Sequence, residues 1–238
     1  MDYFLIDPND IDGDTLIIRG DEQKHLSRVL RKKVGDHVMV TDGKGRMYEA
    51  MVRAFSRTTV ECSVLHVFDR FNEPRVDVTL AISPLKNPAR LDFVVEKATE
   101  LGVRTVIPLL ADRTIRKTGK HDRLEKIAVA ATKQCGRSVV PNIFVSTSFE
   151  TLVQNSAHYD LKLIPHEKTE QSQFVGAVIK HHETAGSVLI LIGPEGGFTD
   201  EEVQLAGKEG FVSISLGPRR LRSETAALSA VSWVVGGW

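Results

Sequence analysis

The sequence is poor in several features that would place a protein in a special class. Its 238 residues include only two cysteines, Cys62 and Cys135, so a network of disulfide bonds does not organise the fold. No apolar run approaches the roughly 20 residues that a membrane-spanning helix requires. The first residues, MDYFLIDP, do not have the pattern of a signal peptide. We therefore expect a cytoplasmic protein without membrane contact.

Motifs for metals and for the common nucleotide cofactors are also missing. The eight histidines and two cysteines do not have the spacing of a metal-ligand set, so we expect no metal. Neither GxGxxG nor GxxxxGK[ST] occurs, which disfavours binding of NAD or ATP through those loops. The hydrophobic fraction of 42% is ordinary and is sufficient for a folded core.

There is no net charge either, which argues against a protein that simply coats a polyanion. The charge is nevertheless unevenly distributed. Residues 104–137 hold nine Lys or Arg against three acidic residues, and residues 24–33 hold five Lys or Arg and no acid. Each patch by itself could be a solvated helix face. Together they favour docking onto a specific folded nucleic acid.

The first 70 or so residues have the pattern of a small β-barrel. Short strands are predicted at residues 15–19, 38–41, 46–52 and 58–64, with a hairpin signal, DGKG, at 42–45. One helix is expected around residues 22–30, and it carries the first basic patch. A polar segment at residues 69–75 is the predicted boundary, so we expect one domain over residues 1–72 and a second over 73–238.

From residue 76 onward, predicted strands and helices alternate. Helical spacing of apolar residues is found at 90–101 and 122–135, whereas residues 188–192 are continuously apolar, as in a buried parallel strand. Thr199 and Glu202 form a capping box, and residues 224–235 predict a nearly all-apolar helix. This alternation predicts an α/β domain with helices on both faces of a sheet.

Three loops follow predicted strands of this sheet. They contain His166 after the strand at 161–164, GPEGG at 193–197, and GPRRLR at 217–222. Ligands of open α/β sheets bind beyond the carboxyl ends of the strands, and glycine lets the backbone approach a ligand closely. The glycines alone could equally be tight turns.

The exact strings are more informative than their spacing. LIGPEGGFTDEEV (191–203) and SLGPRRLRSETAAL (215–228) resemble the two signature motifs of the RsmE family, which belongs to the SPOUT superfamily of methyltransferases. Further blocks, EKATELGV (96–103), KQCGRSVVPNI (133–143) and HLSRVLR (25–31), also resemble family segments in matching order. One departure is Arg220, where the family usually has an aliphatic residue.

The resemblance implies a specific activity and a specific fold. RsmE enzymes use S-adenosylmethionine to methylate N3 of a uridine in 16S rRNA of the small ribosomal subunit. The family implies a homodimer, a PUA-like β-barrel that helps to grip RNA, and a SPOUT-type α/β domain with a deep C-terminal trefoil knot that holds the cofactor. Residue patterns alone would not predict a knot, because chains almost never thread through themselves.

Site residues follow from the matching motifs. We expect the cofactor to contact residues from all three loops, namely Ile164, His166, Leu191, Gly193, Pro194, Gly196, Gly197, Leu216, Gly217, Leu221 and Thr225. We expect RNA phosphates to contact basic residues of both patches, namely Lys24, Arg28, Arg31, Lys32, Arg113, Arg116, Lys117, Arg123 and Arg137.

The chemistry suggests two catalytic candidates. N3 of uracil must lose an imide proton, so the enzyme needs a base or a cation that stabilises charge on O2 or O4. Arg222 is the first candidate for the cation, although it could instead clamp a phosphate or pair with Glu195 or Glu224. Glu195 is a candidate base, unless it only satisfies backbone N–H groups.

Two other functions stay open at this point. One is a different SPOUT activity, such as 2′-O-ribose or tRNA methylation. The other is a ribosome-assembly factor without catalysis, against which the intact glycine motifs argue.

Overall fold

The structure, a computed structural model, describes residues 3–115 and 121–236 and consists of two compact units. Unit 1 comprises residues 1–73 together with 132–140, and unit 2 comprises residues 74–131 and 141–238. The sequence patterns did not indicate that residues 132–140 would belong with the N-terminal unit. None of the described helices combines the length and apolarity needed to cross a membrane.

Unit 1 is built on a six-stranded sheet in the order β1-β4-β5-β6-β3-β2. Four of its strands were predicted, and β3 has the predicted bounds. The described pairings form an open path, so closure into a barrel stays a prediction. The elements are β1 (Tyr3–Leu5), β2 (Ile11–Asp12), β3 (Thr15–Arg19), α1 (Gly20–Lys24), the π-helix η2 (His25–Val29), β4 (His37–Thr41), β5 (Arg46–Phe55) and β6 (Thr59–Asp69), with a 3-10 turn η1 (Pro8–Asp10) before β2.

Residues 132–140 are fastened to unit 1 by a buried ion pair. Arg137 Nη2 lies 2.6 Å from Glu73 Oε2, and both side chains are only 3% exposed. The same carboxylate accepts hydrogen bonds from the backbone N–H groups of Ser138 and Val139, at 3.0 and 2.9 Å. Because every partner is satisfied locally, this charge can be buried without a large penalty.

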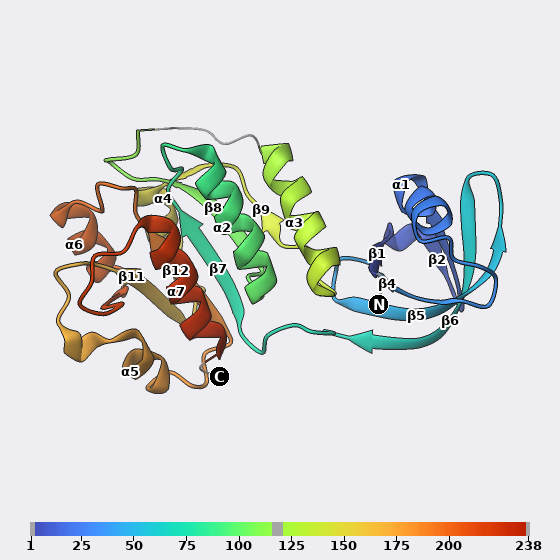
Figure 1. Ribbon diagram of the computed structural model, residues 1–238. Coiled ribbons are helices and arrows are strands. Elements are labelled where there is room, and N and C mark those ends of the chain that lie inside the picture. Colours follow the sequence, from blue (N-terminus) through green and yellow to red (C-terminus); the bar gives the residue numbers. More distant parts are fainter. Residues whose placement is uncertain (1–2, 116–120, 237–238) are drawn as a thin grey trace. The chain divides into compact units, whose positions relative to one another are not determined.

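Unit 2 is the expected α/β domain, with seven strands that are all parallel (Figure 1). Their order is β10-β8-β7-β12-β11-β13, and β9 pairs with β8. The strands are β7 (Asp77–Ile82), β8 (Thr105–Leu110), β9 (Asn142–Ile143), β10 (Thr147–Ser148), β11 (Leu161–Pro165), β12 (Ser187–Ile192) and β13 (Val212–Ile214). The helices are α2 (Pro88–Leu101), α3 (His121–Cys135), α4 (Phe149–Gln154), α5 (Val175–Lys180), α6 (Asp200–Lys208) and α7 (Ser223–Gly236), with a 3-10 turn η3 (Gln171–Gln173) before α5. The last residues of α3, 132–135, belong to unit 1.

Alternate residues of the central strands enter two different cores. In β12, Val188 and Ile190 belong to the core that includes residues of α2, α5 and α7. Leu189 and Leu191 belong to the core on the other side, with residues of α4 and α6. A strand buried on both faces explains the continuous apolar run in the sequence. The helices therefore cover both faces of the sheet and leave its carboxyl edge to the loops.

Candidate functional site

The loops at the carboxyl edge of the sheet in unit 2 enclose one cavity of about 990 Å³. The loops after β11, β12 and β13 all contribute, as the sequence predicted. Its lining residues include His166, Gly193, Pro194, Glu195, Gly196, Gly197, Leu216, Gly217, Leu221 and Arg222. A volume of this size is typical of a small-molecule or cofactor site. Ten of the thirteen residues expected in the cofactor and catalytic site are thus brought together.

Three predicted cofactor residues do not line this cavity. Ile164 and Leu191 are completely buried inside β11 and β12, where their side chains pack in the sheet core. Thr225 is exposed in the first turn of α7. Ile164 and Leu191 therefore stabilise the strands from which the cavity loops emerge.

The conformation of the loop after β12 depends on a positive φ at Gly197 and on a hydrogen bond from Arg113. Gly197 has a φ of +69°, and its N–H donates to the carbonyl oxygen of Pro194 at 2.8 Å. The Arg113 guanidinium donates to the carbonyl oxygen of Gly196 at 2.8 Å. Arg113 was predicted to contact RNA, but here it belongs to the cavity wall. The Thr199–Glu202 capping box then starts α6, as predicted.

The loop after β13 also contains a glycine with positive φ. Gly217 has a φ of +106°, and a Cβ built there would meet no protein atom within 4 Å. Its N–H donates to Ser215 Oγ at 3.2 Å. Such a backbone is favourable only for glycine, and the open space in front of it belongs to the cavity. The missing side chain leaves room for a ligand.

Ion pairs connect the loops around the cavity. Lys168 Nζ lies 2.6 Å from Asp200 Oδ1, and Arg220 Nε lies 3.7 Å from Glu167 Oε2. The hydrogen bond from Lys168, followed by its charge, holds the pKa of Asp200 below its usual value of 3.8. These pairs are exposed, so they contribute little to stability. They link the loop after β11 to the start of α6 and to the loop after β13.

The two catalytic candidates are placed differently. Glu195 Oε1 accepts a hydrogen bond from the backbone N–H of Lys86 at 2.9 Å, so this carboxylate braces the loop that follows β7. Arg222 is exposed on the cavity wall. Among the described residues Arg222 forms an ion pair with neither Glu195 nor Glu224. Glu195 accepts the Lys86 N–H, and Glu224 lies beside Arg90. The sequence did not indicate Arg90, which also lines the cavity.

The structure changes the set of RNA contacts predicted from charge. The prediction for Arg137 is wrong, because its side chain is buried against Glu73. Arg123 is exposed but paired with Asp92 at 2.5 Å. Arg28 and Arg31 are exposed. Lys24 is exposed and paired with Asp21, and Lys32 is partly exposed. Arg116 and Lys117 lie outside the described residues.

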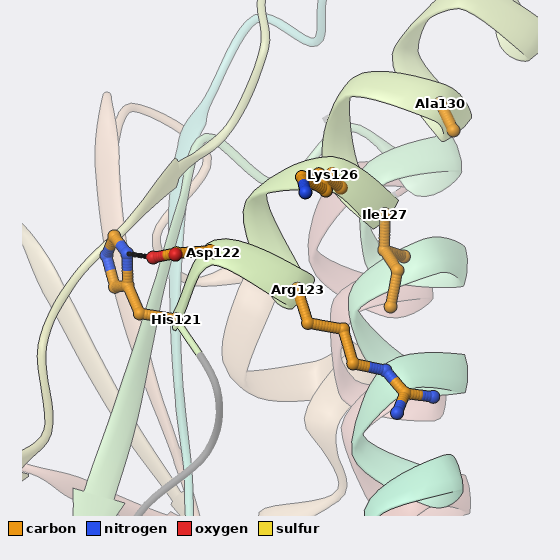
Figure 2. A pocket seen from close by; sticks show the side chains of 6 residues that line it. All are labelled: His121, Asp122, Arg123, Lys126, Ile127 and Ala130. Atoms are coloured by element: carbon orange, nitrogen blue, oxygen red, sulfur yellow. Dashed lines mark ion pairs between the residues drawn. The ribbon is translucent and has the colours of Figure 1, made fainter.

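A second hollow lies along α3 (Figure 2). Figure 2 shows Arg123, Lys126 and Ile127 along this helix, with His121 and Asp122 at its start. His121 Nε2 is 2.7 Å from the carbonyl oxygen of Ile143, and Nδ1 is 3.5 Å from Glu125 Oε2. His121, Asp122 and Glu125 thus form a group with potential metal-ligand atoms within 4.8 Å of one another, a proximity that was not predicted from the sequence.

Comparison with known proteins defines the class to which this fold and site belong. Residues 72–235 match the model of an RNA methyltransferase domain, and residues 18–65 match that of an RNA methyltransferase PUA domain. The protein is therefore an RNA methyltransferase enzyme with an N-terminal PUA domain.

Individual relatives specify the family. The chain is 32% identical to the ribosomal RNA small subunit methyltransferase E of Bacillus subtilis over 231 residues, which cover 92% of this chain and 90% of that protein. It is similar to the crystal structure of the enzyme of that name from Neisseria gonorrhoeae bound to S-adenosyl methionine, with a TM-score of 0.83, 29% identity, and coverage of 97% and 95%. A methyltransferase from Legionella pneumophila in complex with SAM gives 0.79 and 29%, with coverage of 98% and 96%. The chain belongs to the ribosomal RNA small subunit methyltransferase E family, as the sequence motifs predicted.

Proposed function

We propose that this protein transfers a methyl group from S-adenosylmethionine to N3 of a uridine in 16S rRNA, within the 30S subunit. The observation that carries the proposal is that both glycine-rich family motifs line the same cavity. The relatives named above are small-subunit rRNA methyltransferases, and two similar structures are described with this cofactor bound.

The residues of the cavity fit such a cofactor. Gly197 and Gly217 both have positive φ, and a Cβ at either position would meet no protein atom within 4 Å. The wall also combines apolar side chains, such as Leu216 and Leu221, with polar backbone of the loops. This mixture suits a ligand with an adenine ring at one end and charged groups at the other. When bound, S-adenosylmethionine would supply an electrophilic methyl group.

The chain's own residues then have to manage a proton and a negative charge. Removing the N3 proton of uracil leaves charge on O2 and O4, which a nearby cation stabilises. Arg222 supplies this cation in our proposal, since it is exposed on the wall and free of ion pairs among the described residues. Glu195 is the weaker candidate for a base, because Oε1 already accepts the Lys86 N–H.

Replacing Arg222 by alanine tests its role directly. Arg222→Ala should abolish methyl transfer and leave cofactor affinity, measured by calorimetry, nearly unchanged. Equal losses of both would move Arg222 to a binding role.

The overall function is tested with labelled cofactor and two substrates, unmodified 30S subunits and naked 16S rRNA. Mass spectrometry of the digested RNA should identify N3-methyluridine, with faster transfer to the assembled subunit. A 2′-O-methylated nucleoside, or transfer to tRNA only, would identify a different SPOUT activity. Absence of cofactor binding would indicate an assembly factor.

Further features complete the proposal. Residues 1–72 grip RNA, and residues 73–238 catalyse the reaction. The exposed Arg28 and Arg31 support the gripping role. Replacing both by Glu should weaken RNA binding and reduce its salt dependence by about one counterion per lost phosphate contact. An unchanged affinity at every salt concentration would contradict this role.

The knot and the homodimer also belong to this proposal. The segment after β13 pairs with the segment before α5, through the Phe174–Ser215 bridge, before the chain enters α7. This contact supports a C-terminal end that passes through the loop after β11. Trp233 of α7 is 44% exposed and packs edge-on against Phe174, which supports a dimer interface there. Light scattering of Trp233→Glu should show a monomer. The cell compartment is proposed to be the cytoplasm.

A further inference from the structure

We infer that Arg90 is a second catalytic cation, which contacts a carbonyl oxygen of the target uracil, and that Glu224 is its positioning residue. The inference rests on the proposed N3 methylation. Neither residue was given this role by the sequence motifs, since Arg90 lies more than 100 residues before the first glycine-rich loop.

Arg90 reaches the cavity from a rigid position. It lies in the first turn of α2, whose N-terminus is capped by the Asn87 side chain, which accepts the N–H of Ala89 at 3.0 Å. The preceding loop is tied to the GPEGG motif by the Lys86–Glu195 hydrogen bond. α2 packs along α7 (Figure 1). The base of the Arg90 side chain is therefore fixed relative to both glycine-rich motifs.

Glu224 directs the guanidinium. Arg90 Nε is 3.6 Å from Glu224 Oε1, with the Arg90 side chain 36% exposed and that of Glu224 only 13%. The second oxygen, Oε2, is buried and has no hydrogen-bond partner among the described residues. A buried carboxylate with an unsatisfied oxygen is costly unless a cation is held close to it. The pair thus keeps a cation at the cavity wall, and Nε faces the acid while Arg90 also lines the cavity.

Three of the other cations on the cavity wall have partners within the protein, and Arg219 is exposed. Arg113 is bound to the carbonyl oxygen of Gly196, Lys168 to Asp200, and Arg220 to Glu167. Phosphate contacts come from exposed side chains at the rim. Arg90, by contrast, is partly enclosed and shares its wall with Arg222 and Ser223, so it faces the group that enters the cavity. In the proposed reaction this group is the base.

The charge balance defines what Arg90 does. When N3–H is lost as a proton to water, the electron pair remains on the ring and spreads over O2 and O4. A guanidinium beside one of these oxygens lowers the energy of that anion, and Arg222 could serve the other. Such donors in an enclosed site act mainly on kcat, because the ground-state uracil is neutral.

The test compares Arg90→Gln with a matched control, Arg104→Gln. The Arg104 side chain has a similar exposure, 40%, and a similar ion-pair distance, with Nε 3.5 Å from Asp77 Oδ2, but it does not line the cavity. We expect Arg90→Gln to lower kcat about 100- to 1,000-fold, with little change in the KM for RNA. Arg104→Gln should stay within about twofold of the unmodified enzyme.

Restoring activity with a more acidic substrate distinguishes a catalytic role of Arg90 from a structural one. An RNA with 5-fluorouridine at the target position carries a more acidic N3–H, so it needs less help from a cation. Most of the loss in Arg90→Gln should disappear with this RNA. Glu224→Gln should show a smaller loss with the same rescue, and the double variant should be no worse than Arg90→Gln alone. A loss that fluorination does not reduce, or a higher KM with unchanged kcat, would overturn the inference and indicate a structural or phosphate contact.

A binding measurement distinguishes failure of this inference from failure of the proposed function. At alkaline pH the unmodified protein should bind the fluorinated RNA more tightly than the uridine RNA, and Arg90→Gln should lose this preference. If the preference depends on Arg90 but no N3-methyluridine is formed, the cation site stands and the proposed function falls. If N3-methyluridine is formed and the preference does not depend on Arg90, the inference falls and the function stands.

Discussion

Breaking the Glu73–Arg137 pair should cost unit 1 a large share of its stability. Both side chains are 3% exposed, and the carboxylate also accepts the N–H groups of Ser138 and Val139. Glu73→Gln would leave the Arg137 charge buried without a counter-charge. Removing one partner of such a pair typically costs about 3–5 kcal/mol. The whole stability of a domain is only about 5–15 kcal/mol, so this change should be easy to detect.

The assay needs to distinguish the two units. Trp233 lies in α7, so its fluorescence during denaturant unfolding reports on unit 2. Hydrogen exchange measured by mass spectrometry reports on unit 1, where residues 132–140 and the neighbouring strands should lose protection in Glu73→Gln. The control is Asp69→Asn, because Asp69 is 83% exposed and lies 3.6 Å from Arg46. An exposed pair of this kind contributes at most about 1 kcal/mol.

Two outcomes would refute this reasoning. One is a change in the free energy of unfolding for Glu73→Gln that is no larger than for Asp69→Asn. The other is strict additivity of Glu73→Leu and Arg137→Met, because replacing both partners by apolar groups should cost much less than the sum of the two single changes.

Three further predictions concern the glycine loop, Arg113 and Cys62. Gly217→Ala should weaken cofactor binding at least tenfold in calorimetry, because the added methyl group occupies cavity space and the φ of +106° adds backbone strain of about 1–3 kcal/mol. The control is Gly210→Ala, which has a φ of +82° and lies outside the cavity. This control should lose stability but keep the cofactor affinity of the original protein. Arg113→Ala should raise the cofactor Kd and leave the salt dependence of RNA binding unchanged, because its guanidinium holds Gly196. Burial raises the pKa of the Cys62 thiol from 9.0 to about 12, so the free energy of unfolding should fall as pH rises from 9.0 towards 12, and Cys62→Ala should remove that slope.

Sequence reasoning succeeded where structure is set locally. The strand at 15–19 and the capping box of Thr199 and Glu202 were predicted because their signals lie within a few residues. α2 ends at Gly102, which adopts a φ of +105°. The short strands β1, β2, β9 and β10 were missed, since two or three residues carry no periodicity. Their existence depends on partners elsewhere, such as Tyr3 opposite Met39.

The start of α4 (Phe149–Gln154), which was not predicted, also has a local signal in the sequence. Ser148 caps α4, because its side chain accepts the N–H of Thr151, and Glu150 lies in the first turn of this helix. A polar cap followed by an acid and apolar residues is a recognisable helix start. This helix start is therefore predictable from the sequence.

The site was predictable to the extent that it consists of backbone. Both glycine-rich motifs lie on the cavity, because a glycine requirement is visible in the sequence at the position where it acts. Charged side chains are different, since their partners cannot be read from their neighbours. Glu195 is held by the backbone of Lys86, 109 residues earlier in the chain, and Arg137 by Glu73, 64 residues earlier.

These distant partners give Glu195 and Glu224 a structural role in the two glycine-rich motifs. One glutamate of each glycine-rich motif reaches the segment that follows β7: Glu195 accepts the backbone N–H of Lys86, and Glu224 lies beside the guanidinium of Arg90. Both therefore brace a fourth loop and helix against the cavity. In these positions Glu195 holds the backbone of a neighbouring loop, and Glu224 holds a cation beside the cavity. In the proposed reaction the main energetic cost is the negative charge that develops on uracil. This arrangement therefore favours catalysis by the arginines on the cavity wall, which stabilise that charge, over catalysis by a carboxylate base.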